Sequence, residues 1–260
     1  MKKIIGCIIL LVLFVFSLLF SSFSTSVDLS LRLSPPSLEA PFGYDTLGRN
    51  LLERVASGTL VSFSISLPVA LVSVACGTVI AYLMSLNGFL FSSLMVCCNS
   101  FKAIPATIIA LFLLSLSGPG IIKMIVALSI AMVSNVARSL VSQIKAISSE
   151  AYIKTSEGFG IGKARIFTTH ILPKLFPYLS EQFISVMLYA IIAESSLSYL
   201  GCGVEITTPS LGAILAELRP FFLNAPWTLA FPSTVLFLLG LSLSLISSAF
   251  SSKSEFDTTA

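Results

Sequence analysis

Long apolar runs constrain this 260-residue chain more than any other feature. A helix needs about 20 apolar residues to cross the roughly 30 Å hydrocarbon core of a bilayer. The runs of sufficient length are 4–23, 59–86, 90–117, 120–143, 180–200 and 229–250. Only 10% of the residues are charged, against about a quarter in soluble domains. Because lipid offers backbone groups no hydrogen-bond partners, the sequence predicts an all-α integral membrane protein with six transmembrane helices.

The first apolar run also has features of a signal peptide, because Lys2 and Lys3 precede it. Its apolar part is slightly longer than a usual signal-peptide core, and the following SSFSTS offers a poor cleavage site. We therefore expect residues 1–20 to be retained as a transmembrane helix.

Basic residues indicate the orientation, since cytoplasmic loops carry an excess of Lys and Arg. The loop 144–179 is the most basic of the chain and contains Lys145, Lys154, Lys163, Arg165 and Lys174. With this loop in the cytoplasm, both termini are also cytoplasmic, and the segments 24–58 and 201–228 lie outside. The net charge of +3 then follows from topology and does not indicate nucleic-acid binding.

Cysteine and histidine give no sign of a metal or catalytic site. The five cysteines include no C-x₂-C pair, and four of them lie in apolar runs, where cysteine behaves as a small apolar residue. The single histidine, His170, has no cysteine or carboxylate close by in sequence. We therefore predict no metal, no cofactor and no catalytic residue.

The segment before the second run is amphipathic from Asp45 onward. Leu47, Leu51 and two further apolar residues, Leu52 and Val55, fall on one side of a helix, and Arg49, Asn50, Glu53 and Arg54 on the other. This pattern is typical of a helix lying on a membrane surface. Prolines inside the second and third runs, Pro68 and Pro105, predict bends in those helices.

The basic loop contains the stretch EGFGIGKA, residues 157–164, which superficially resembles a phosphate-binding loop. The P-loop spacing requires a glycine at Glu157 and Ser or Thr at Ala164, so the match fails. The sequence instead predicts one helix from Glu150 to about Gly158, a break at Gly160 and Gly162, and a second short helix that Pro173 ends.

Around this break the loop resembles the cytoplasmic coupling loop of ABC-importer permeases. Its order AISSEAYIKTSEGFG…RIFTTHILP is similar to a motif of E-A-A, three residues, glycine, nine residues and I-x-L-P. Gly160 matches the motif glycine, and His170, Leu172 and Pro173 match its end. Lys154, Thr155 and Ser156 occupy the E-A-A positions, which is the largest departure from the motif.

Three other stretches resemble the C-type dipeptide and oligopeptide permeases of this family. They are APFGYDTLGRNLLERVASGTLVSFSI (40–65), AIIAESSLSYLGCGVEITTPSLGAIL (190–215) and NAPWTLAFP (224–232). The chain departs from the family at Asn50, at Thr59 and Leu60, and at Leu211. The resemblance covers about residues 40–250.

The resemblance implies a fold, a function and partners. The fold is that of an ABC type I importer permease, with an N-terminal helix and outer segment (1–58), a core (59–250) that includes the coupling loop 145–175, and a cytoplasmic tail (251–260). The chain forms half of a di- or oligopeptide pathway in a bacterial inner membrane. Its implied partners are a homologous permease, two ATPase subunits that hydrolyse ATP and dock on the coupling loop, and an external substrate-binding protein.

Two ionisable residues within apolar runs are candidates for the pathway or its gate, because such residues mark functional sites in membranes. Glu194 could serve in gating or in a buried structural pair, and Lys102 could meet a peptide carboxylate or extend toward the inner surface. A permease for nickel or another small solute is the nearest alternative. A membrane-embedded enzyme or a non-transporting scaffold is more remote, since the runs offer no paired catalytic side chains.

Overall fold

The computed structural model describes residues 2–21, 27–86, 88–205 and 208–257, with side chains as far as residue 250. The described part of the chain is built from helices, and one isolated β-bridge joins Tyr44 to Asn50. The expected cleavage-site segment falls partly on residues 22–26, outside the described residues. The expected tail 251–260 begins as helix, since α10 extends to Asp257.

Five helical stretches of the described chain are long and apolar enough to cross a membrane. They are Lys2–Phe20 (α1), Leu51–Leu86 (α2), Ile121–Ser148 (α5), Lys163–Tyr199 (α7, η2 and α8) and Trp227–Phe250 of α10, which as a whole runs Trp227–Asp257. A sixth candidate is a bent pair, α3 (Gly88–Lys102) followed by α4 (Ala106–Ser117). Counted as one span, this pair gives the six spans that the sequence predicts.

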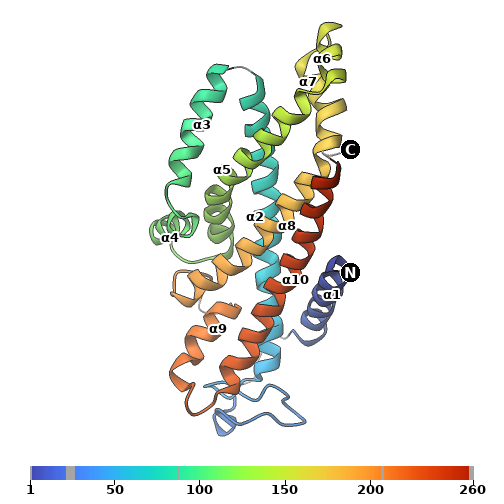
Figure 1. The fold of residues 1–260 in the computed structure, drawn as a ribbon. Coiled ribbons are helices and arrows are strands. Elements are labelled where there is room, and N and C mark those ends of the chain that lie inside the picture. The colour runs from blue at the N-terminus through green and yellow to red at the C-terminus, as the bar shows by residue number, and fades with distance from the viewer. Residues whose placement is uncertain (1, 22–26, 87, 206–207, 258–260) are drawn as a thin grey trace.

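The helices pack side by side in one elongated bundle (Figure 1). α2 lies in the middle and packs against α5 and α8, while α1 packs against α10. Small residues allow the close contacts: a Cβ on Gly6 would lie 2.7 Å from the Ser242 carbonyl oxygen, and one on Gly77 would lie 2.6 Å from Val136. Close packing at small residues is the usual way in which membrane helices associate.

The third apolar run is broken rather than merely bent. α3 ends at Lys102, and α4 leaves it at 82° after a break that contains Ile104 and Pro105. Proline lacks an amide hydrogen and disfavours helical conformation in the residue before it, so the α3 ladder stops and Pro105 becomes the N-cap of α4. α2, in contrast, continues as a helix through Pro68.

The expected surface helix from Asp45 does not form, and this prediction was wrong. The Asp45 carboxylate accepts hydrogen bonds from the amides of Leu47 (2.8 Å) and Arg49 (2.9 Å), which holds the backbone in a turn instead of a helix. Gly48 completes the turn with a φ of +70°. The helix begins only at Leu51 as the first turn of α2, and Leu51 is buried.

Pro173 does not end the second helix of the basic loop, as the sequence had suggested. α7 (Lys163–Ile166) passes into a π-helical turn, η2 (Phe167–Ile171), and then into α8 (Leu172–Tyr199). The π turn ends just before Pro173, which therefore lies in the first turn of α8, where proline is tolerated. The result is one helical stretch of 37 residues.

Candidate functional site

The break predicted in the basic loop is present as an elbow, residues 150–166, at one end of the bundle (Figure 1). α6 (Ala151–Gly158) ends in a turn in which the Gly160 amide donates to the Glu157 carbonyl (2.9 Å) and the Ile161 amide to the Ser156 carbonyl (3.3 Å). This pair of bonds is the Schellman motif, which needs a left-handed residue after the helix. Gly160 supplies it with a φ of +78°.

Space around Gly160 is open, because an added Cβ would meet no atom within 4 Å. Glycine is therefore required there by its backbone conformation and not by crowding. The structure confirms the helix–glycine–helix geometry expected from the sequence.

Each limb of the elbow is fixed to the bundle. Ile153 of α6 and Ile166 of α7 are buried in the core. Lys163 donates to the Leu86 carbonyl at the end of α2 (2.7 Å), and Lys174 of α8 pairs with Glu150 (2.6 Å). The elbow is thus attached to α2 and α8 at its base while its tip projects.

The tip presents side chains that the rest of the chain does not cover. Phe159 is 82% exposed, which is unusual for a phenylalanine in a polar loop. Lys154 and Thr155 are exposed and Ser156 is partly buried, and the two hydroxyls bond to carbonyls of α6 itself. The tip therefore offers an exposed apolar side chain, Phe159, and α6 also carries the exposed cation Lys154.

The other predicted coupling residues lie at the base of the elbow. The ring of His170 contacts the ring of Tyr152 at 6.1 Å between centroids. Leu172 and Pro173 form the start of α8, with Leu172 partly buried and Pro173 exposed. The structure brings His170 next to α6 but leaves Leu172 and Pro173 on the helix that leads away from it.

Glu194 lies deep in the bundle, on α8, and is fully buried. Its carboxylate accepts hydrogen bonds from the hydroxyls of Ser198 (2.8 Å), Ser195 (3.2 Å) and Ser62 of α2 (3.2 Å). Buried carboxylates need such donors, and here hydroxyls provide them. The cluster ties α8 to α2, which supports the structural interpretation of Glu194 left open by the sequence.

A short helix, α9 (Leu211–Leu218), packs over this cluster. A Cβ on Gly212 would lie 2.0 Å from the Ser195 carbonyl oxygen, and one on Gly58 of α2 would lie 3.1 Å from the Leu211 amide nitrogen. α9 is thus in close contact with both helices that Glu194 joins.

Lys102, the second ionisable candidate, lies elsewhere. It lines a pocket of about 540 Å³ at the α3–α4 break, together with residues of α5 and α8. Glu194 does not line this pocket. The structure therefore separates the two candidates that the sequence grouped together.

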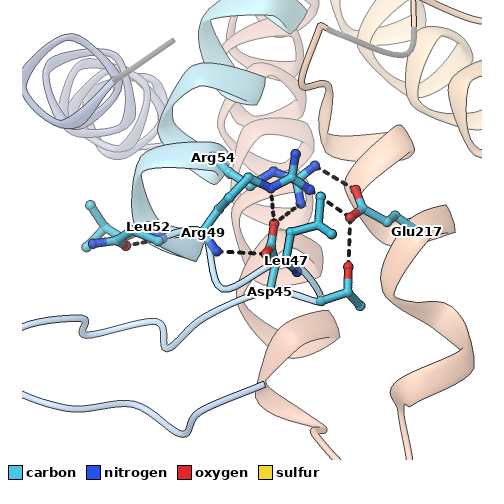
Figure 2. A network of polar contacts seen from close by, with 8 residues as sticks. Asp45, Leu47, Arg49, Leu52, Arg54 and Glu217 are labelled. Carbon is cyan, nitrogen blue, oxygen red and sulfur yellow. Dashed lines mark hydrogen bonds and ion pairs between the residues drawn. The ribbon is translucent and has the colours of Figure 1, made fainter. Parts of the chain in front are cut away.

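A network of four charged side chains (Figure 2) joins α9 to the segment before α2, at the end of the bundle opposite the elbow (Figure 1). The Asp45 carboxylate binds Arg49 (2.6 Å) and Arg54, and Glu217 of α9 binds Arg49 (2.8 Å) and Arg54 (2.7 Å). Thr46 also donates to Glu217 (3.0 Å). Asp45 has no exposed side-chain surface.

This network was not predicted from the sequence. Arg49 and Arg54 were expected on the polar side of a surface helix, and Glu217 was given no role. The pairing joins positions 163 to 171 residues apart, which no local pattern can show. The sequence did contain one indication of this network. The two segments expected outside both carry charges of mixed sign, and opposite charges on the two segments can pair.

The fold defines the class of protein. It matches a chain of the MetNI methionine ABC transporter in an inward-facing conformation, with a TM-score of 0.61 over 76% of this chain and 96% of that chain, at 16% identity. A second crystal form of the same transporter gives a TM-score of 0.56. The chain is an all-helical membrane subunit with the type I importer fold.

The sequence comparisons identify the family. Residues 73–255 match the family described as binding-protein-dependent transport system inner membrane component, and the chain belongs to it. A protein of Brucella suis biovar 1 named as a peptide transport system permease is 32% identical over 85% of this chain and 75% of its own length. The glutathione transport system permease protein GsiD of Escherichia coli O6:K15:H31 is 29% identical over 81% of this chain and 70% of its own length. The chain is therefore a multi-pass inner membrane component of a transport system.

Proposed function

We propose that this chain is the permease subunit of an ATP-driven importer of di- or oligopeptides and forms half of the transmembrane pathway. The observation that carries this proposal is the similarity over most of the chain to permeases named for peptide and glutathione transport. A homologous permease would supply the other half, two ATPase subunits would hydrolyse ATP, and an external binding protein would deliver the peptide.

The elbow is the part that we assign to the ATPase. Its exposed Phe159 would enter a groove on that partner, and Gly160 would hold the turn that presents this ring. This assignment places the elbow and both termini in the cytoplasm, in agreement with the basic residues of the loop.

The contacts of the elbow indicate how a force applied to it would reach the transmembrane helices. The Lys174–Glu150 pair joins the start of the elbow to the helical stretch Lys163–Tyr199, and the second limb of the elbow, with the buried Ile166, is the beginning of that stretch. That stretch contains Glu194, which is bonded to α2. A rigid element of this kind can move as one body when ATPase subunits close, and alternating access would follow from this movement.

The proposal is tested by co-expressing the chain with its neighbouring transporter genes and measuring uptake in proteoliposomes. We expect ATP-dependent uptake of a labelled dipeptide and none of nickel ions. Replacing Gly160 by Val should leave the complex assembled but abolish uptake, because valine does not tolerate a φ of +78°. Gly158→Ala is the matched control, since its added methyl meets no atom within 4 Å. Uptake of nickel ions would refute the assignment of a peptide substrate. Full dipeptide uptake by Gly160→Val would refute the role of the elbow.

A further inference from the structure

We propose that the pocket at the α3–α4 break binds a carboxylate of the transported solute through Lys102, and this inference rests on the proposed function. We call this space the break pocket. Its polar lining consists of Lys102, Thr107, Asn135, Gln182, Ser185 and Tyr189. The solute class is a peptide or another small molecule with a free carboxylate.

The pocket exists because the third apolar run is broken. α3 ends at Lys102 and α4 turns away by 82°, so the two helices do not fill the space beside α5 and α8. Its volume of about 540 Å³ lies within the usual range for small-molecule sites. Irregular backbone at membrane depth is tolerated where it lines a cavity, which is the situation of Ile104 and Pro105.

The charge of the pocket is unbalanced. Lys102 is its cation, and no acidic side chain is among its described lining residues. The remaining polar groups are neutral hydroxyls and amides. An ionisable side chain within a membrane-spanning region is costly and marks a functional site by default. The lining therefore favours an anion as the ligand.

Two cations of α5 show how side chains of α3 can act as partners for a positive charge. Arg138 of α5 donates to the side-chain oxygen of Asn99, and Lys145 of α5 lies 3.3 Å from the centroid of the Phe91 ring. Lys102 has no hydrogen bond or ion pair with the described residues. Lys102 thus differs from Arg138 and Lys145 in that it faces the pocket and has no such partner among the described residues.

The neutral groups suit the remainder of a peptide. Asn135 and Gln182 carry amides that can pair with peptide N–H and C=O groups. Gln182 is held in place because its amide nitrogen donates to the Ser139 hydroxyl (3.1 Å). Ser185 is likewise bonded to Ser247 of α10 (2.9 Å). These bonds orient one side of the pocket before a solute arrives.

The test compares a labelled dipeptide with the same dipeptide carrying a C-terminal amide, in proteoliposomes with the full transporter. The pair is chosen so that the external binding protein holds both equally, and that protein is kept saturating. The variants are Lys102→Gln, which removes the charge, and Lys102→Arg, which keeps it. Lys123→Gln is the control, because Lys123 lies at the start of α5, outside the break pocket.

We expect Lys102→Gln to lower uptake of the free-acid dipeptide at least about tenfold, the worth of a hydrogen bond to a charged group, and uptake of the amide less than about twofold. Lys102→Arg and the control should retain most uptake of both. Equal loss for both dipeptides, or a loss that varies with anionic lipid content, would assign Lys102 to packing or to a lipid headgroup and overturn the inference. Full uptake by Lys102→Gln would also overturn it, whereas absence of dipeptide uptake by the unmodified transporter would contradict the proposed function instead.

Discussion

The two ends of this molecule differ in how far the chain itself pairs or covers the side chains that they carry. At the network end, Arg49 and Arg54 are each bonded to both Asp45 and Glu217, and the chain supplies every partner. At the elbow end, Phe159 is 82% exposed and the space around Gly160 is empty. The four charges of the network are paired within the chain, whereas the elbow tip carries an aromatic side chain that the described residues leave exposed.

Under the proposed function, the network end is the fixed end and the elbow is the end that receives a force from the ATPase. A short helix, α9, is held at the network end by ion pairs and by the close contact of Gly212 with α8. The elbow contacts the bundle only at its base, so its tip is accessible to a partner protein. We therefore expect substitutions at the network end to reduce stability and substitutions in the elbow to reduce coupling.

The largest effect is expected from Asp45→Ala. Removing this buried carboxylate leaves Arg54, whose side chain is only 9% exposed, without one of its partners. Breaking a buried ion pair in this way costs about 3–5 kcal/mol. The measurement is the thermal unfolding midpoint of the purified transporter in mild detergent. Glu39→Ala, which removes an exposed acid from the same segment, is the control, and an equal midpoint for both variants would contradict the account.

An intermediate effect is expected from Gly212→Ala. Its methyl carbon would lie 2.0 Å from the Ser195 carbonyl oxygen, so α9 must move away from α8. Overpacking of this kind costs about 1–3 kcal/mol. Gly158→Ala at the elbow end is the matched comparison and should be neutral or slightly stabilising, because alanine favours helix more than glycine does. Similar losses of stability for the two variants would remove the distinction between the ends.

The smallest effect on stability is expected from Lys174→Gln. This change breaks the Lys174–Glu150 pair, which is an ion pair like those at the network end but has a lysine side chain that is 50% exposed. Exposed pairs contribute about 0–1 kcal/mol, so the unfolding midpoint should hardly change. Dipeptide uptake should nevertheless fall, because the base of the elbow is loosened. A large drop in the midpoint with unchanged uptake would show that this pair serves stability instead.

The sequence was sufficient for features that depend on composition or local chemistry. Apolar runs located the spans, because lipid demands about 20 apolar residues for each helix. The elbow turn was also predictable, since Gly160 lies just after a short helix, at the position where a left-handed residue is needed. Both features are encoded within a few dozen consecutive residues.

Features that depend on distant partners were not predictable. Arg49 and Arg54 have the spacing of a polar helix face, but Asp45 binds the local amides and Glu217 lies at least 163 residues away. Pro173 reads as a helix end, yet it lies in the first turn of α8, where proline is tolerated. The break at Pro105 was underestimated as a bend, and with it the pocket beside Lys102.

Photo-crosslinking tests whether the elbow tip, and not the network end, meets the ATPase. A photoreactive phenylalanine analogue is placed at Phe159 in one sample and at Leu38, a fully exposed residue of the segment expected outside, in another. Both samples contain the co-expressed transporter in membranes. We predict that the probe at 159 links the chain to an ATPase subunit and that the probe at 38 does not. A crosslink to the ATPase from 38, or none from 159 in an assembled and active transporter, would contradict the account.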